Sequence, residues 1–131
     1  KQVVRDLNFD LEILVGPIVR EPDGLAMSSR NMYLSSADRK ECTVLYRSLL
    51  LAEAMAGEGE RRCPVIISKM RELITSQSSG VIDYVSIADP LTLDEMADLR
   101  DGGTALASLA VRFGATRLID NLQLSLYSPK Q

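Results

Sequence analysis

The chain has 131 residues, of which 46% are hydrophobic and 25% charged, and its net charge is −3. This length suffices for one ordinary domain, or for one small domain with a piece of another. Because acidic and basic residues are interspersed and no long apolar run occurs, the composition argues against a nucleic-acid-binding face and against a membrane span.

The first third of the chain predicts a helix end, an extended apolar segment and a loop. Residues 1–7 carry apolar side chains at helical spacing, and Asn8 is a plausible stop. Residues 11–15 predict a buried strand, which is followed by a Gly-Pro turn and a second extended piece. Residues 20–34 then form a long loop, and loops of that length are usually functional or mobile.

The middle third predicts two amphipathic helices. Ser35 and Ser36 supply the N-cap of a long helix that ends near residues 57–59. Cys63-Pro64 opens the second helix, because proline is favoured in a first helical turn.

The last third predicts an antiparallel sheet. Residues 81–88 are rich in β-branched side chains and form a strand, and residues 92–99 form a short helical turn or an irregular link. Residues 104–113 suit a helix as well as a strand. We favour a strand, because a tight connection leads to residues 117–121 and the two segments together resemble a hairpin. The residues from 125 onward form a polar tail.

Several polar residues have an ordinary structural interpretation. Cys42 and Cys63 have neither zinc-site nor disulfide spacing and fit reduced thiols of a cytoplasmic protein. Asp120 and Asn121 are interpreted as a turn that ends the last strand. The absence of histidine excludes any mechanism that needs an imidazole from this chain alone.

The most informative stretch is Asp23-Gly24-Leu25-Ala26-Met27-Ser28-Ser29-Arg30-Asn31. Its glycine permits a sharp turn, its serines offer hydroxyl and N–H groups, and its arginine offers a planar fork of donors for phosphate oxygens. Leu25 and Met27 would fix the base of the loop against the fold. Such a loop can hold a triphosphate and neutralise the charge that builds up as pyrophosphate leaves. The competing interpretation is an ordinary capped connection before a helix.

Over essentially its whole length the chain resembles the pantothenate synthetase (pantoate–β-alanine ligase) family. The resemblance rests on the stretch above and on Val15-Gly16-Pro17-Ile18-Val19-Arg20-Glu21, Tyr33-Leu34-Ser35, Asp83-Tyr84-Val85 and Thr116-Arg117-Leu118-Ile119-Asp120-Asn121.

The resemblance implies an α+β fold. Residues 1–34 would be a helix–strand remnant of a Rossmann-like nucleotide-binding domain together with the loop. Residues 35–125 would be a small C-terminal lid domain of helices packed on a short antiparallel sheet, and residues 126–131 a tail. The implied reaction has two steps: ATP, with Mg²⁺, adenylates the carboxylate of pantoate, and the amine of β-alanine then attacks the pantoyl adenylate.

The resemblance also implies the site residues. Met27-Ser28-Ser29-Arg30 would be the counterpart of the KMSKS loop of class I aminoacyl-tRNA synthetases. Ser28, Ser29 and Arg30 would be the catalytic residues that hold the ATP phosphates, Met27 would add a backbone contact, and Val19 would meet the adenine through its backbone. No metal ligand is identified in this chain, and the full-length enzyme would be a cytoplasmic homodimer.

The chain departs from the family in one respect. The family carries a His-x-Gly-His motif and a Gly-Glu-Lys-Asp stretch ahead of the position at which this sequence begins, and neither is present here. We therefore expect this chain to be the C-terminal part of the enzyme and to be inactive alone. We also expect it to self-associate through its apolar residues Val3, Val4, Leu11 and Ile13. The alternatives are a stand-alone binding module with the lid fold, or another ligase of the nucleotidyltransferase superfamily with a different acyl substrate.

Overall fold

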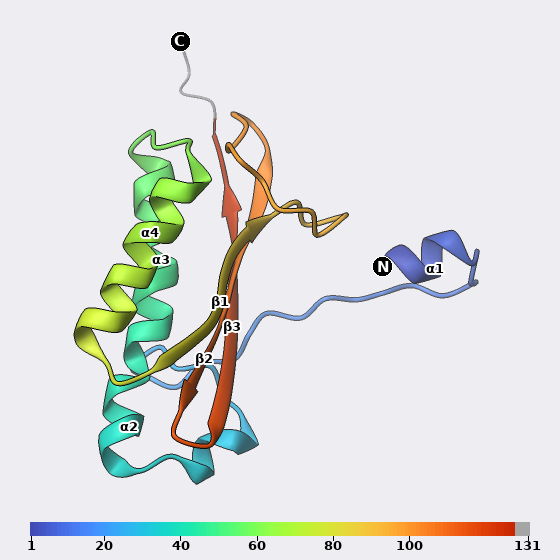
Figure 1. Cartoon of the computed structure of the whole chain (residues 1–131). Coiled ribbons are helices and arrows are strands. Elements are labelled where there is room, and N and C mark those ends of the chain that lie inside the picture. Colours follow the sequence, from blue (N-terminus) through green and yellow to red (C-terminus); the bar gives the residue numbers. More distant parts are fainter. Residues whose placement is uncertain (128–131) are drawn as a thin grey trace.

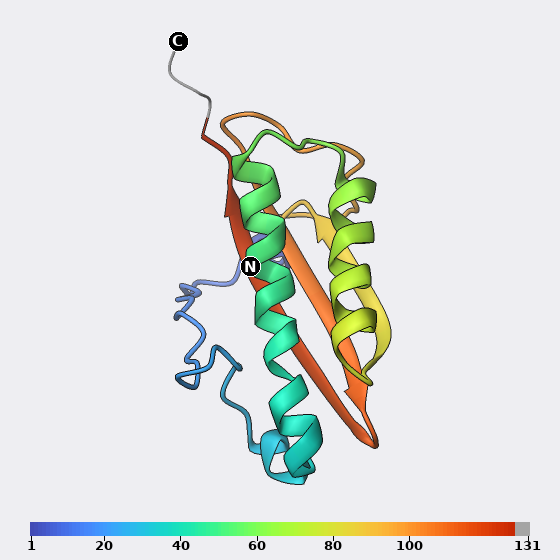
Figure 2. The same ribbon diagram turned by 90° about the vertical axis from the view of Figure 1, so that its left-hand side faces the viewer.

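Two helices form where apolar side chains recur at helical spacing, and both cover the same face of a sheet. The computed structural model describes residues 1–127 and places α3 (Thr43–Gly57) beside α4 (Cys63–Gln77) (Figure 1, Figure 2). The start of α4 at Cys63, with proline in the first turn, confirms the predicted boundary. Within residues 1–127, no helix is long and apolar enough to cross a membrane.

The single long helix predicted after Ser35 is wrong in one respect, because it is divided at Cys42. The helix α2 (Ser36–Glu41) ends just before Cys42, and α3 begins just after it, at Thr43. The predicted cap is confirmed, since the Ser35 hydroxyl oxygen accepts a hydrogen bond from the Asp38 N–H at 3.0 Å. The division arises where the Leu45 N–H reaches back only three residues, to the Cys42 carbonyl, which tightens that turn.

Three antiparallel strands form the sheet in the order β1–β2–β3. They are β1 (Val81–Ala88), β2 (Thr104–Phe113) and β3 (Thr116–Ser125), so the strand assignment of residues 104–113 and the hairpin are both confirmed. The last strand continues four residues beyond its predicted end. Residues 92–99 form an irregular link, held by isolated bridges to Arg62 and Ala88.

One hydrophobic core fills the space between the helices and the sheet. Its side chains come from α3, α4 and all three strands, and those of the central strand β2 come from alternate residues. The largest fully buried side chains include Leu45, Leu49, Ile66, Met70, Ile74, Ile87, Leu109 and Phe113. Leu126, which the sequence placed in the polar tail, is buried too, and its N–H donates to the Gly103 carbonyl. Residues 128–131 of the predicted tail lie outside the described residues.

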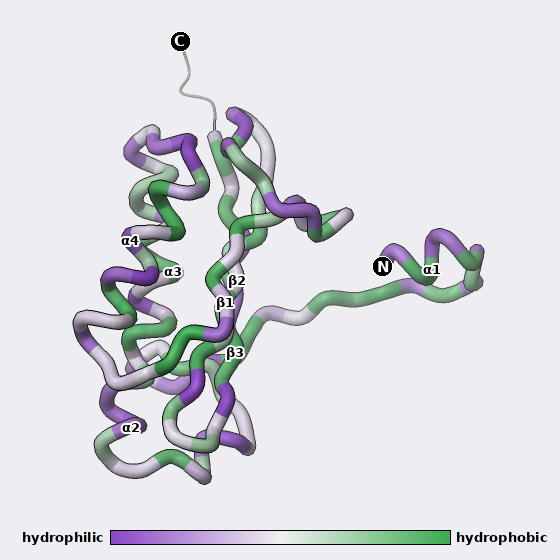
Figure 3. Tube along the Cα trace, viewed as in Figure 1, coloured by the Kyte–Doolittle hydropathy of each residue, from purple (hydrophilic) through white to green (hydrophobic). Residues whose placement is uncertain are grey.

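The N-terminal segment lies apart from this core (Figure 1). The helix α1 (Gln2–Asp6) and the positive φ of Asn8, at 51°, confirm the predicted helix end and stop. The strand predicted at residues 11–15 is wrong, because no described residue pairs with it. Its apolar side chains are exposed, with Leu14 82% and Val15 74% exposed, which agrees with the predicted unpartnered surface. Figure 3 shows this extended stretch coloured as hydrophobic. A strand needs a neighbouring strand for its backbone hydrogen bonds, and none is described here.

Both cysteines are buried and free, and we expect their thiols to be unreactive in the folded protein. Burial raises the pKa of the Cys42 thiol to about 12 and also raises the pKa of Cys63. At pH 8, alkylation by iodoacetamide should therefore be slower than that of the unfolded chain by more than about 100-fold. Because its folded-state pKa is raised, Cys42 contributes stability below the unfolded thiol pKa of about 8.5. That contribution to stability is lost as the pH rises toward 12. In the alkylation test, a reaction of the folded protein at the rate of the unfolded chain would contradict the burial of the thiols.

Candidate functional site

The stretch of residues 23–31 folds back on the residues that precede it. The Met27 N–H donates to the Val19 carbonyl at 2.9 Å, and the Glu21 N–H donates to the Leu25 carbonyl at 2.8 Å. Gly24, at φ 93°, makes the turn between these bonds. Leu25 is buried, as predicted, whereas Met27 is 56% exposed, so the expectation that it anchors the loop is wrong. The turn thus brings together the first two predicted ATP-binding residues, Val19 and Met27.

The other three predicted site residues follow at the start of a short 3₁₀ helix, η1 (Ser29–Tyr33). The Ser28 hydroxyl oxygen accepts a hydrogen bond from the Arg30 N–H at 3.2 Å and caps η1, so the capped-connection interpretation is also realised. The Arg30 guanidinium is exposed and donates to the Arg117 carbonyl at 3.3 Å, which ties η1 to β3. Two hydroxyls and one guanidinium therefore lie within three consecutive residues at the surface.

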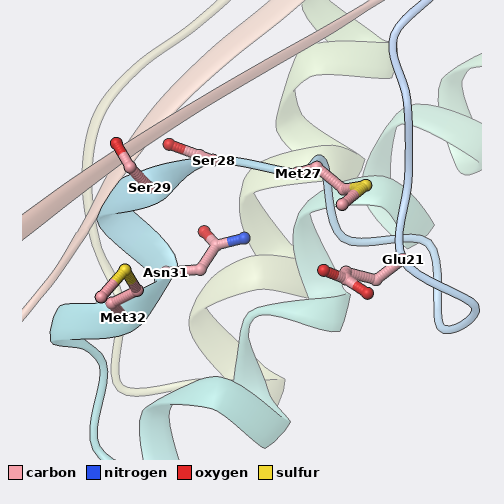
Figure 4. A pocket seen from close by; sticks show the side chains of 6 residues that line it. All are labelled: Glu21, Met27, Ser28, Ser29, Asn31 and Met32. Atoms are coloured by element: carbon pink, nitrogen blue, oxygen red, sulfur yellow. The ribbon is translucent and has the colours of Figure 1, made fainter.

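Two hollows adjoin this segment. One, of about 560 Å³, is open and is lined by Glu21, Met27, Ser28, Ser29, Asn31 and Met32 (Figure 4). The other, of about 300 Å³, lies between the segment and β3 and includes Ser28, Arg30 and Arg117 in its lining. Met27, Ser28 and Asn31 belong to both hollows.

Asn31 ties η1 back to Ala26, the residue that precedes Met27. Its side-chain amide donates to the Ala26 carbonyl at 3.1 Å, and Figure 4 shows it between the serines and the side occupied by Glu21 and Met27. The prediction quoted Asn31 within the motif but gave it no role. Only the donor side of this amide has a partner, because the buried Asn31 Oδ1 accepts no hydrogen bond from the described residues.

The interpretation of Asp120 as part of a turn is wrong. Asp120 lies in the middle of β3, opposite Leu109 of β2, and its side chain is 2% exposed. It accepts two hydrogen bonds from the Arg20 guanidinium, at 2.6 Å and 3.0 Å. Because these partners are 100 residues apart, no local pattern could have revealed the pair.

Arg112 and Arg117 lie at the surface beside the hairpin. They face each other across β2 and β3, and both donate to the Asp83 carboxylate at the bulge of β1. Asp83 thereby relieves the repulsion of two like charges in a cross-strand pair. The hydrogen bond from Arg117 holds the pKa of the Asp83 carboxyl below its ordinary value.

The second ion pair of the loop lies at its tip. Arg39 of α2 donates to both carboxylate oxygens of Asp23, at 2.7 Å and 3.2 Å, and lowers the pKa of that carboxyl. Since the pKa is lowered in the folded state, the stabilisation is present above the unfolded carboxyl pKa of about 3.9 and is lost as the pH falls below it. The tip of the loop is therefore fixed to α2 at neutral pH.

Comparisons with known proteins show the family of the chain. A family described as pantoate-beta-alanine ligase matches residues 1–123. The pantothenate synthetase of Syntrophomonas wolfei is 51% identical over 93% of this chain and 43% of its own length, and that of Desulfatibacillum aliphaticivorans is 47% identical over 92% and 42%. The chain thus spans less than half the length of these curated relatives.

Solved structures give the same result. The pantothenate synthetase of Thermus thermophilus superposes with a TM-score of 0.81 at 41% identity, covering 95% of this chain and 44% of that one. The pantoate-beta-alanine ligase of Francisella tularensis, described as complexed with beta-gamma ATP and beta-alanine, has a TM-score of 0.55 at 25% identity, covering 92% and 36%. The fold, the loop sequence and both kinds of comparison agree, and the chain belongs to the pantoate-beta-alanine ligase family.

Proposed function

We propose that this chain supplies the phosphate-binding loop and the lid of an ATP-dependent ligase that condenses pantoate with β-alanine through a pantoyl adenylate. The observation that carries the proposal is the placement of Ser28, Ser29 and Arg30 together at an exposed edge, beside two hollows and next to β3. Membership of the family supports the choice of substrates.

The chemistry asks for positioning and charge stabilisation rather than a protein nucleophile. A carboxylate oxygen of pantoate attacks the α-phosphorus of ATP, the bond between that phosphorus and the bridging oxygen breaks, and pyrophosphate leaves with the electron pair. Arg30 would stabilise the charge that grows on the leaving group, and the two serines would donate hydrogen bonds to phosphate oxygens. The amine of β-alanine then displaces AMP from the acyl carbon.

The adenine contact assigned to Val19 remains compatible with the hydrogen bonds of the loop. Its carbonyl oxygen accepts from Met27 and keeps a second lone pair for another donor. Residues 1–127 contain no group of three or more Asp, Glu, Cys or His that could hold a metal ion.

Burial supports the proposed division of the chain into two parts. Residues 35–125 carry nearly all of the core, and we propose that they are the lid domain. The exposed apolar residues at 11–19 fit a remnant of a Rossmann-like domain whose other strands would cover them.

The test is an activity comparison between two polypeptides. The full-length protein that contains this sequence should form pantothenate from ATP, pantoate and β-alanine, whereas the 131-residue chain should form none and should bind ATP weakly. Pantothenate formation by the chain alone would contradict the assignment of a partial site. Turnover of other carboxylic acids in preference to pantoate by the full-length protein would favour a ligase with a different acyl substrate.

A further inference from the structure

Arg20 has contacts that the proposed reaction does not use. Its guanidinium lies 4.0 Å from the centroid of the Tyr46 ring of α3, and its side chain is only 17% exposed. It pairs through two hydrogen bonds with Asp120, whose side chain is 2% exposed, and it also donates to the Gly24 carbonyl at 3.1 Å. One side chain thus joins the loop, a helix and the last strand.

These contacts all act on the segment that carries the proposed site. Arg20 forms the isolated bridge with Ala26, and the next pair on the side toward the serines, Val19 and Met27, is joined by the hydrogen bond from the Met27 N–H to the Val19 carbonyl. A guanidinium held at its far end by Asp120 therefore fixes the direction in which the chain enters Ser28 and Ser29.

We propose that Arg20, held by Asp120 and stacked on Tyr46, is a positioning residue that sets the place of the Met27–Arg30 segment against β3 for adenylate formation. This inference rests on the proposed function. Arg20 touches no phosphate in this role and acts only through the backbone of the loop.

An arginine is required at this position for geometric reasons. Its planar fork can make two parallel hydrogen bonds to one carboxylate while its face stacks on an aromatic ring. A lysine offers a point charge and can do neither in the same way. A displacement of about 1 Å can cost about 100-fold in rate, so the position of such a residue has a direct effect on turnover.

The first measurement uses backbone amide hydrogen exchange in the full-length protein and does not depend on the reaction. Asp120→Asn and Arg20→Lys should each increase the exchange rates of the Glu21 and Met27 amides by about tenfold or more, while amides in the middle of β2 keep their protection. The control is Asp101→Asn, which removes the carboxylate that pairs with Arg61 at the opposite end of the lid. Unchanged protection of the Glu21 and Met27 amides from hydrogen exchange in both the Asp120→Asn and the Arg20→Lys variant would overturn the proposal.

The second measurement separates the two half-reactions. Asp120→Asn should slow pantoate-dependent ATP–pyrophosphate exchange by about 10–100-fold, whereas the attack of β-alanine on added pantoyl adenylate should keep its rate. Arg20→Lys should show a smaller loss, and the double variant should lose little more than Asp120→Asn alone, because the two side chains act as one pair.

The outcomes distinguish this inference from the proposed function. If the unaltered full-length protein forms no pantothenate, the proposed function fails, and the positioning role for adenylation fails with it. If that protein is active but the Asp120→Asn and Arg20→Lys variants both catalyse ATP–pyrophosphate exchange at the rate of the unaltered protein, only the positioning role of Arg20 fails. Equal losses in both half-reactions would identify a general structural effect and would also overturn the positioning role.

Discussion

Replacing Arg30 by alanine in the full-length protein is expected to slow adenylate formation by about 10²–10³-fold. The guanidinium is exposed, lies near the start of η1 and lines the smaller hollow. Its hydrogen bond to the Arg117 carbonyl is long enough, at 3.3 Å, to be exchanged for one to a phosphate oxygen. Because the charge of the leaving pyrophosphate grows in the transition state, the loss should fall on kcat more than on the KM for ATP. Pantoate-dependent ATP–pyrophosphate exchange measures this step.

Two further variants make the Arg30 result specific. Arg30→Lys should recover part of the rate, since it keeps the charge and loses the planar fork. Arg62→Ala is the matched control, because Arg62 is an exposed arginine whose side chain pairs with Glu60, away from the loop. An exchange rate for Arg30→Ala equal to that of the Arg62 variant would refute the assigned role.

Replacing Gly24 by alanine is expected to destabilise the chain by about 2–5 kcal/mol. A Cβ atom at this position would lie 2.4 Å from the Cδ1 atom of Tyr46, and the φ of 93° is unfavourable for any L side chain. The backbone cost is about 1–2 kcal/mol, and forcing an extra carbon into a packed contact adds about 1–3 kcal/mol. Tyr46 cannot move freely, because Arg20 stacks on its ring. Urea unfolding followed by circular dichroism measures the loss.

Gly59 provides the control for the backbone term. Its φ is 106°, close to that of Gly24, but a Cβ built there meets nothing within 4 Å. Gly59→Ala should therefore cost only the backbone term of about 1–2 kcal/mol. Equal losses for the two variants would show that Tyr46 does not restrain the loop. In the full-length protein, Gly24→Ala should also lower the adenylation rate, whereas Gly59→Ala should not.

Local sequence signals located most of the secondary structure. Ser35 as an N-cap, Cys63-Pro64 as a helix start and the glycine-led hairpin before Thr116 all act through the chemistry of adjacent residues, and all three were found where predicted. The strand predicted at residues 11–15 failed for the opposite reason. Its apolar pattern is typical of a strand, but its backbone hydrogen bonds depend on neighbouring strands that the described residues do not contain.

Asp120 shows a similar limit for the site. Its sequence neighbourhood resembles a turn, because Asp-Asn pairs commonly bond nearby backbone groups. The Asp120 carboxylate does accept from the Asn121 N–H, at 2.8 Å, but its dominant partner is Arg20. A buried charge requires an opposite charge nearby in the fold, and that partner can be distant along the chain. Local sequence patterns therefore do not predict such a pair.

The sequence by itself determined the family, the α+β class and the residues of the proposed phosphate-binding loop, because a motif of consecutive residues and the caps of the helices are properties of neighbours along the chain. Only the tertiary structure decided how that loop is held. Its turn packs Gly24 on Tyr46, its entry is fixed by Arg20 on Asp120, and its exit is tied by Arg30 to β3. These contacts join residues that are distant in sequence, and packing and charge pairing select them only once the helices and the sheet have come together.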